Sequence, residues 1–163
     1  MPLFEVTNFY DRIYTWFDFL TSKGCFIISY VIMPNHLHFI LYIPDSSAPI
    51  HQVIGEGKRF MAYQIVHILK KQNQVLLLEK MKGGVTASEA KNKVRHKVFE
   101  DSFDCKACYS LEFIRQKINY IHINHIHPKW QLVQLPEEYV HSSASFYLTG
   151  EQGIYPVTHF LEF

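Results

Sequence analysis

A nearly unbroken apolar stretch runs from Cys25 to Ile43, and its one sharp interruption at Pro34-Asn35 most constrains the fold. Residues 25–33 are rich in isoleucine, valine and aromatic side chains, a composition typical of a β-strand. Residues 38–43 have the same character and end before Pro44-Asp45, a turn signal. The sequence therefore predicts two consecutive strands separated by the Pro34-Asn35 break.

Two histidines, His36 and His38, stand one residue apart beside this break. Successive side chains of a strand point to opposite faces, so the two imidazoles share one face while Leu37 points to the core. Two neighbouring imidazoles on a rigid strand form half of a divalent-metal site. Without further context, a pair of half-exposed surface histidines explains the same pattern.

A predicted helix that opens at Ser110 carries Tyr120 and Asn124, four residues apart and therefore neighbours on one helical face. A phenol on a helix that faces a metal site is suited to attack on a phosphodiester. The alternatives are a packed aromatic side chain for Tyr120 and a helix C-cap for Asn124. Three histidines crowd the same region, and their roles stay open between chance and phosphate contact: His122, His125 and His127.

The remaining pattern predicts alternating helices and strands in one α+β domain that spans residues 1–163. The predicted order of helix, strand, strand, helix, strand and helix is what remains of a ferredoxin-like layout. We expect an antiparallel sheet with helices packed on one face. The expected elements other than the two strands and the Tyr120 helix are helices at 8–20, 49–71, 74–82 and 139–148 and a short strand near 98–99.

The ordered set of motifs resembles the REP-associated tyrosine transposases, a branch of the single-tyrosine HUH endonucleases. The strand string Tyr30-Val31-Ile32-Met33-Pro34-Asn35-His36-Leu37-His38 contains the family's His-hydrophobe-His motif. Tyr120-Ile121-His122-Ile123-Asn124 matches the family's tyrosine helix, and Tyr139-Val140-His141-Ser142-Ser143 matches a later segment with a serine pair. The resemblance covers residues 25–147 in the right order.

This resemblance implies a metal-dependent endonuclease and transposase for single-stranded, hairpin-flanked DNA. Tyr120 is then the nucleophile that forms a 5′-phosphotyrosine, and the metal ligands are His36, His38 and Asn124. The resemblance implies Mg²⁺ or Mn²⁺, whereas the residues alone equally allow Zn²⁺ or Co²⁺. It also implies a tight hairpin at Pro34-Asn35, with the histidines opening the returning strand. Ser142 and Ser143 are expected to cap a helix of the C-terminal tail.

The chain departs from the family pattern in two places. The family has a strand before the first helix, but residues 3–6 make a poor strand, so we expect an N-terminal strand to be missing. That loss exposes a sheet edge and favours a homodimer through it. The family's Asn-Pro reads Asn124-His125 here, so the helix is expected to run on. These departures leave a second hypothesis open, namely a catalytically inactive remnant that binds DNA hairpins.

Charge and cysteine content set further limits. The formal net charge is only +1, so a DNA enzyme with this composition must concentrate positive charge locally. The candidate DNA contacts are the basic residues Lys58, Arg59, Lys91, Lys93, Arg95 and Lys97, each of which is equally explained as a solvated surface residue.

Three cysteines, an odd number, favour a reducing cytoplasm. Cys105 and Cys108 have the spacing of half a zinc ribbon, but a second cysteine pair is missing, which favours two plain thiols. No apolar run is long enough to predict a membrane span.

Overall fold

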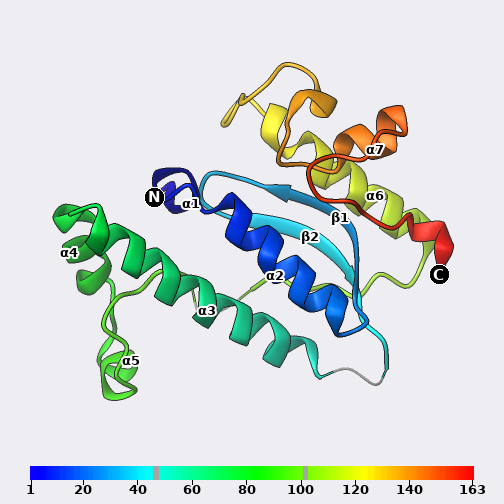
Figure 1. The fold of residues 1–163 in the computed structure, drawn as a ribbon. Coiled ribbons are helices and arrows are strands. Elements are labelled where there is room, and N and C mark those ends of the chain that lie inside the picture. Colours follow the sequence, from blue (N-terminus) through cyan, green and yellow to red (C-terminus); the bar gives the residue numbers. More distant parts are fainter. Residues whose placement is uncertain (46–47, 101–102) are drawn as a thin grey trace. The chain divides into compact units, whose positions relative to one another are not determined.

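The computed structural model describes residues 1–45, 48–100 and 103–163, which divide into two compact units (Figure 1). The hairpin unit comprises Met1–Ser47 and Lys106–Phe163, and the helical unit comprises Ala48–Cys105. We had expected a single domain, and we describe each unit by itself. Within the described residues, no helix is both long and apolar enough to span a membrane.

An antiparallel β-hairpin forms the centre of the hairpin unit. Strand β1 (Phe26–Ile32) pairs with β2 (Leu37–Tyr42), and Ile32 lies opposite Leu37 across the turn. Met33 N donates to His36 O at 2.8 Å, which closes the turn around Pro34-Asn35. The predicted strands and the tight hairpin are therefore confirmed, with His36 ending the turn and His38 inside β2. The other elements of this unit are α1 (Leu3–Val6), α2 (Tyr10–Ser22), α6 (Leu111–Ile123), η1 (Asn124–Ile126), η2 (Pro136–Glu138), α7 (Ala144–Thr149) and η3 (Phe160–Glu162).

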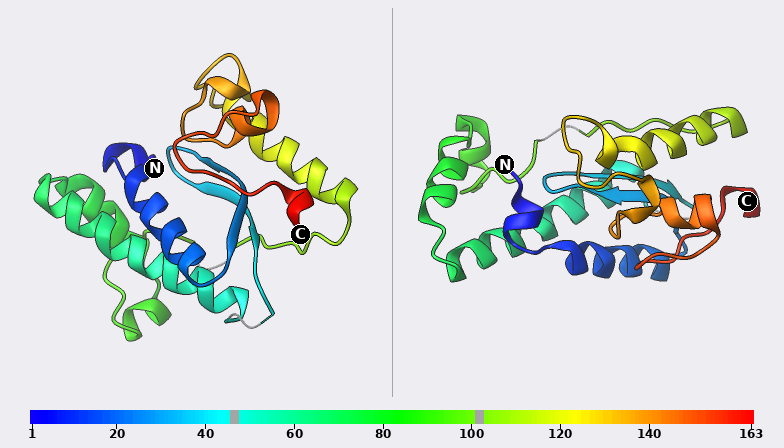
Figure 2. Two further views of the ribbon diagram at one scale, coloured as in Figure 1. Left: turned by 45° about the vertical axis from the view of Figure 1, so that its right-hand side comes forward. Right: turned by 90° about the horizontal axis from the view of Figure 1, so that it is seen from above.

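The helices α2 and α6 pack on opposite faces of the hairpin, as the view from above shows (Figure 2). Tyr30 points to the α2 side, where its ring lies 5.6 Å from that of Phe17. The next residue, Val31, points to the other side and packs in a buried cluster with Ile121 of α6. Because adjacent strand residues face opposite sides, the expectation of helices on one face is wrong. The hairpin lies between two helical layers, so β1 is buried on both faces.

The free edge of β1 is covered by the C-terminal part of the same chain. A single bridge pairs Val31 with Ser142, so this segment occupies the place beside β1 where a third strand would lie. Tyrosine and serine hydroxyls supply part of the hydrogen bonding that a regular strand would provide. The bonds are Ile32 N to His141 O, Ser143 N to Tyr30 O, Thr158 N to Ile27 O, Tyr30 N to Ser143 Oγ, Tyr139 Oη to Ile32 O and Tyr147 Oη to Ile28 O.

This covered edge changes one expectation about the N-terminal side. Residues 3–6 form the short helix α1 and not a strand, in line with their poor strand pattern. The sequence predicted a homodimer through an exposed sheet edge, and the β1 edge is not such an edge, because it is hydrogen-bonded within the chain. The homodimer itself stays a prediction, and this edge gives it no support.

A buried histidine ties three segments of the hairpin unit together. His122 of α6 has its Nε2 atom 3.1 Å from Ser29 Oγ on β1 and 2.9 Å from Ser143 Oγ before α7. Ser143 Oγ also accepts a hydrogen bond from Tyr30 N at 2.9 Å. Ser143 is the N-cap residue of α7, but its hydroxyl joins this cluster and makes no capping hydrogen bond. The expected helix-capping role of the serine pair is therefore met only by Ser142, whose Oγ accepts from Ala144 N at 3.1 Å.

The helical unit contains α3 (Ile50–Lys71), α4 (Val75–Gly83) and α5 (Ala87–Lys91), and α3 packs against α4. The predicted helices at 49–71 and 74–82 are thus confirmed. The predicted strand near Val98-Phe99 is wrong, because residues 94–100 have no regular secondary structure. In the described residues the sheet has two strands. The fold is therefore mixed α and β with an antiparallel hairpin.

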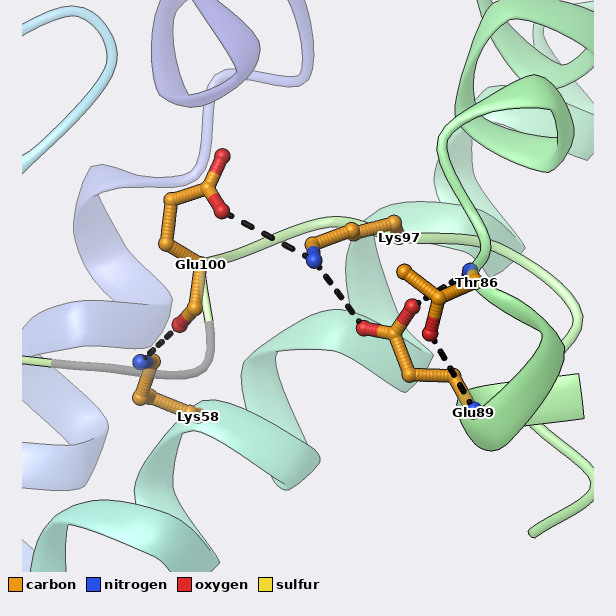
Figure 3. A network of polar contacts seen from close by, with 5 residues as sticks. All are labelled: Lys58, Thr86, Glu89, Lys97 and Glu100. Atoms are coloured by element: carbon orange, nitrogen blue, oxygen red, sulfur yellow. Dashed lines mark hydrogen bonds and ion pairs between the residues drawn. The ribbon is translucent and has the colours of Figure 1, made fainter.

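The polar contacts that hold this unit's loop involve two of the predicted DNA-binding lysines (Figure 3). Thr86 and Glu89 form a reciprocal capping box at the start of α5. Lys97 Nζ lies 3.1 Å from Glu89 and 3.7 Å from Glu100, and its side chain is only 19% exposed. Lys58 donates to the backbone carbonyl of Glu100. Both ammonium groups therefore have structural partners that a DNA phosphate would have to displace.

The buried His122 predicts that acid destabilises the protein. Burial, followed by the charge of His125, lowers the pKa of His122 to about 4 from 6.5. The folded state therefore binds this proton less tightly than the unfolded state, and stability falls as the pH drops below about 6.5 towards 4. We expect a loss of about 3 kcal/mol in the free energy of unfolding over that range, measured by urea titration with circular dichroism.

Two variants test this assignment. His122→Gln is expected to start less stable at neutral pH but to lose less stability on acidification. His67→Gln removes an exposed histidine of α3 and is expected to retain the parental pH dependence. An unchanged pH dependence in His122→Gln would show that other groups control acid unfolding.

Candidate metal and tyrosine site

His36 and His38 come together at the turn end of the hairpin. Their Nε2 atoms are 3.1 Å apart, and the two rings meet edge to face with centroids at 4.7 Å. The prediction that both imidazoles share one face is confirmed by this contact. Leu37, between them, is half-buried.

The hydrogen bonding of His36 determines which of its two ring nitrogens can bind a metal ion. Its Nδ1 lies 2.6 Å from Asn35 Oδ1, an atom that can only accept, so Nδ1 carries the proton. Burial, together with the nearby charges of His38 and Lys129, lowers the pKa of His36 to about 4. His36 is therefore neutral at pH 7 and presents a bare Nε2 to His38, which is the form that binds metals.

The distance between the two Nε2 atoms fits neighbouring ligands of one cation. Two atoms that each lie about 2.1 Å from a metal and subtend a right angle are separated by about 3.0 Å, whereas a tetrahedral angle requires about 3.4 Å. The observed 3.1 Å, which is also the length of a hydrogen bond between the two rings, lies between these two values. No third His, Cys, Asp or Glu of the described residues joins the pair. Amide, water and phosphate oxygens are ligands that Mn²⁺ and Mg²⁺ accept beside imidazole nitrogens.

Tyr120 lies beside this pair and is accessible. Its ring centroid is 5.5 Å from that of His38 in an edge-to-face arrangement, and its side chain is 51% exposed. Ile118, Ile121 and His122 form the buried face of α6, so the rotation of the helix leaves Tyr120 on the accessible side. The expected proximity of the phenol to the histidines is therefore present.

Asn124 is less clearly part of the site. It follows α6 in helical backbone geometry, with φ −61° and ψ −42°, and starts the 3-10 turn η1. Its position four residues after Tyr120 puts it on the same side of the helix. Among the contacts of the described residues, none links its side chain to either imidazole. The α-helix ends at Ile123 and continues only as the single 3-10 turn η1. We expected the helix to run on because histidine replaces proline after Asn124, and beyond this one turn that expectation is wrong.

The neighbouring histidines have structural positions. His122 is hydrogen-bonded in the serine cluster described above. His125 is fully buried, stacks on Tyr139 at 4.8 Å and has Nε2 within 2.9 Å of Pro136 O. His127 is exposed, and its Nδ1 accepts from Lys129 N.

Three side chains around the pair were not singled out from the sequence: Lys117, Lys129 and Trp130. Trp130 lies with its ring 5.7 Å from that of His36, and Lys129 Nζ lies 5.6 Å above the Trp130 ring. Lys117 Nζ lies 5.9 Å from the Tyr120 ring. The helical spacing of Lys117 and Tyr120, three residues apart, was the only available signal for any of them.

The six predicted basic contacts all belong to the helical unit. Arg59, Lys91, Lys93 and Arg95 are exposed, whereas Lys58 and Lys97 make the intrachain contacts of Figure 3. Their relation to the histidine pair stays a prediction. Comparison of the chain with protein-family models, curated proteins and solved structures finds no match.

The histidine pair predicts a measurable cation site. His36→Gln and His38→Gln are each expected to weaken Mn²⁺ binding by at least about tenfold, because each removes one of two imidazole ligands. Isothermal titration calorimetry measures the affinity. His67→Gln is the matched control, because His67 is exposed on α3 and is expected to retain full binding. Equal affinity in all four proteins would place the cation elsewhere.

Proposed function

We propose that this protein is a metal-dependent, single-tyrosine DNA endonuclease and transposase of the type that its sequence resembles. The observation that carries the proposal is the convergence of two Nε2 atoms 3.1 Å apart with an accessible phenol whose ring lies 5.5 Å from His38. We propose a ferredoxin-like layout as its finer class, supported by the antiparallel hairpin that follows α2, with α6 added on the opposite face of the hairpin.

The proposed reaction begins with Tyr120. Its phenolic oxygen attacks the scissile phosphorus, the new bond forms a 5′-phosphotyrosine, and the bond from phosphorus to the 3′ oxygen breaks. The phenolic proton passes to solvent, and the departing 3′ oxygen takes up a proton to become a free hydroxyl. The phosphodiester is thereby conserved as a phosphotyrosine, so a DNA 3′ hydroxyl can later reverse the step and complete strand transfer.

The histidines have a separate role from the nucleophile. His36 and His38 would hold Mg²⁺ or Mn²⁺, with Asn124 as a further oxygen ligand. The cation supplies Lewis-acid polarisation of the scissile phosphate when it is bound. Asn35 holds the His36 ring in the orientation and tautomer that ligation requires. The accessible phenol favours a single strand as substrate, since a single strand bends readily so that one phosphate approaches both groups.

The nucleophile assignment predicts the behaviour of Tyr120→Phe. This variant is expected to form no covalent adduct with a single-stranded oligonucleotide in the presence of Mn²⁺, while its affinity for the same oligonucleotide stays within about twofold, because only the reacting oxygen is lost. Denaturing gel electrophoresis measures the adduct. Tyr109→Phe is the control, because Tyr109 is 94% exposed and is expected to leave the adduct unchanged. An adduct in Tyr120→Phe would exclude this nucleophile.

A DNA-binding protein without cleavage activity is the second candidate. The observation that favours it is that no contact of the described residues links Asn124 to the imidazoles, so the geometry does not place this predicted third ligand at the pair. The two functions differ in one experiment, which is the incubation of single-stranded oligonucleotide hairpins with protein and Mn²⁺. Cleavage that is abolished by chelator supports the endonuclease, whereas tight binding without adduct or cleavage supports the binding protein.

The ligand assignment of Asn124 makes its own prediction. If Asn124 completes the site, Asn124→Ala is expected to reduce adduct formation by about tenfold or more at limiting Mn²⁺ and to recover partly at high Mn²⁺. Gln116→Ala on the exposed surface of α6 serves as the control. Equal rates in the parent and Asn124→Ala would leave the two histidines as the protein's contribution to the metal.

A further inference from the structure

Two ammonium groups flank the histidine pair, and each rests on an aromatic ring of the site. Lys117 Nζ lies 5.9 Å from the Tyr120 ring and 5.1 Å from the Phe113 ring. On the other flank, Lys129 Nζ lies 5.6 Å from the Trp130 ring, which is itself 5.7 Å from His36. Successive contacts therefore link Lys117, Tyr120, His38, His36, Trp130 and Lys129 in this order.

Neither ammonium group has a carboxylate partner among the ion pairs of the described residues. The Lys117 side chain is half-buried because it lies along the rings of Phe113 and Tyr120, one turn to either side on α6. An ammonium that packs on an aromatic ring keeps its charge and loses part of its freedom of motion. Both lysines are thus positioned cations, and neither forms an ion pair with a carboxylate within residues 1–45, 48–100 and 103–163.

We propose that Lys117, Trp130 and Lys129 form the track that holds a single-stranded nucleic acid across the histidine and tyrosine site. Lys117 contacts a phosphate on the Tyr120 side, Lys129 contacts a phosphate on the His36 side, and Trp130 stacks on an intervening base. Alternation of basic and aromatic side chains is the pattern by which proteins hold single strands without reading their sequence. The proposal rests on the proposed function for its substrate class, and it assigns the strand-holding role to residues of the hairpin unit.

The test uses Tyr120→Phe as background, so that binding is measured without reaction. The probe is a fluorescein-labelled oligothymidylate of about 20 nucleotides, and its affinity is measured by anisotropy at several salt concentrations. Lys117→Gln and Lys129→Gln are each expected to weaken binding about three- to tenfold at low salt and to lower the slope of log affinity against log salt by about 0.7.

Arg115→Gln is the matched control for these two variants. Arg115 lies on the same helix as Lys117 and also rests on a ring, that of Phe160 at 5.7 Å, but this ring is not part of the histidine site. We expect its affinity and salt slope to equal those of the background protein. An equal loss of affinity in Arg115→Gln and both lysine variants would contradict the proposed strand-holding role. Unchanged affinity in both lysine variants would contradict it as well.

Trp130 provides a second readout that a purely structural role would not change. The chain has two tryptophans, and Trp16 is buried on α2, so quenching of tryptophan emission by the bound oligonucleotide reports on Trp130. We expect quenching in the background protein and none in Trp130→Phe, in which the smaller ring keeps the packing against the Val31 cluster. Identical quenching in both proteins would exclude stacking on Trp130.

The outcomes separate this inference from the proposed function. If the salt slopes and the quenching are as expected but the parent protein forms no adduct with Mn²⁺, the strand-holding role of Lys117, Trp130 and Lys129 is supported and the endonuclease activity is excluded. For the converse outcome, Lys117→Gln and Lys129→Gln are also made in the parent protein, where Tyr120 is present. Unaltered adduct formation in these two proteins, together with unchanged affinity in the Tyr120→Phe background, would support the endonuclease and exclude the strand-holding role of the lysines.

Discussion

The hydrogen-bonded cluster of His122, Ser29 and Ser143 fixes the geometry on which the candidate site depends. A buried imidazole must find polar partners, and here both of its hydroxyl partners come from other segments, 93 and 21 residues away in the chain. The cluster therefore sets the rotation of α6 against β1. Because His122 points inward, Tyr120 is directed to the accessible side, where its ring reaches His38.

The hairpin supplies the other half of this geometry. Its turn is closed by the backbone bond from Met33 to His36, and Asn35 holds the ring of His36 from the adjacent position. Both imidazoles are thus carried by a short, strongly paired element and not by a long loop. A rigid strand and a rigid helix, locked together by one buried cluster, can hold reacting groups more precisely than loops do.

Local patterns predicted much of this arrangement, and long-range contacts account for what they missed. The strands, the tight turn, the Ser110-capped helix and the shared face of His36 and His38 follow from spacing within a few residues. The covered edge of β1 does not, because it depends on Ser143, Tyr139 and Tyr147, more than a hundred residues further on. The predicted strand near Val98 failed because an apolar pair gives no indication of a pairing partner. For the same reason, periodicity could not tell which face of the hairpin each helix covers.

Charge explains why composition alone said little about a nucleic-acid partner. A net charge of +1 over 163 residues leaves no general attraction for a polyanion. The dense basic run at 91–97 is partly neutralised, since Lys97 pairs with Glu89 and Glu100. Lys117 and Lys129 are isolated in the sequence, but aromatic rings hold them at the two flanks of one site. Cations that are already held in place lose less side-chain entropy when a phosphate binds than cations on mobile side chains, so a low net charge is compatible with the proposed role of these two lysines.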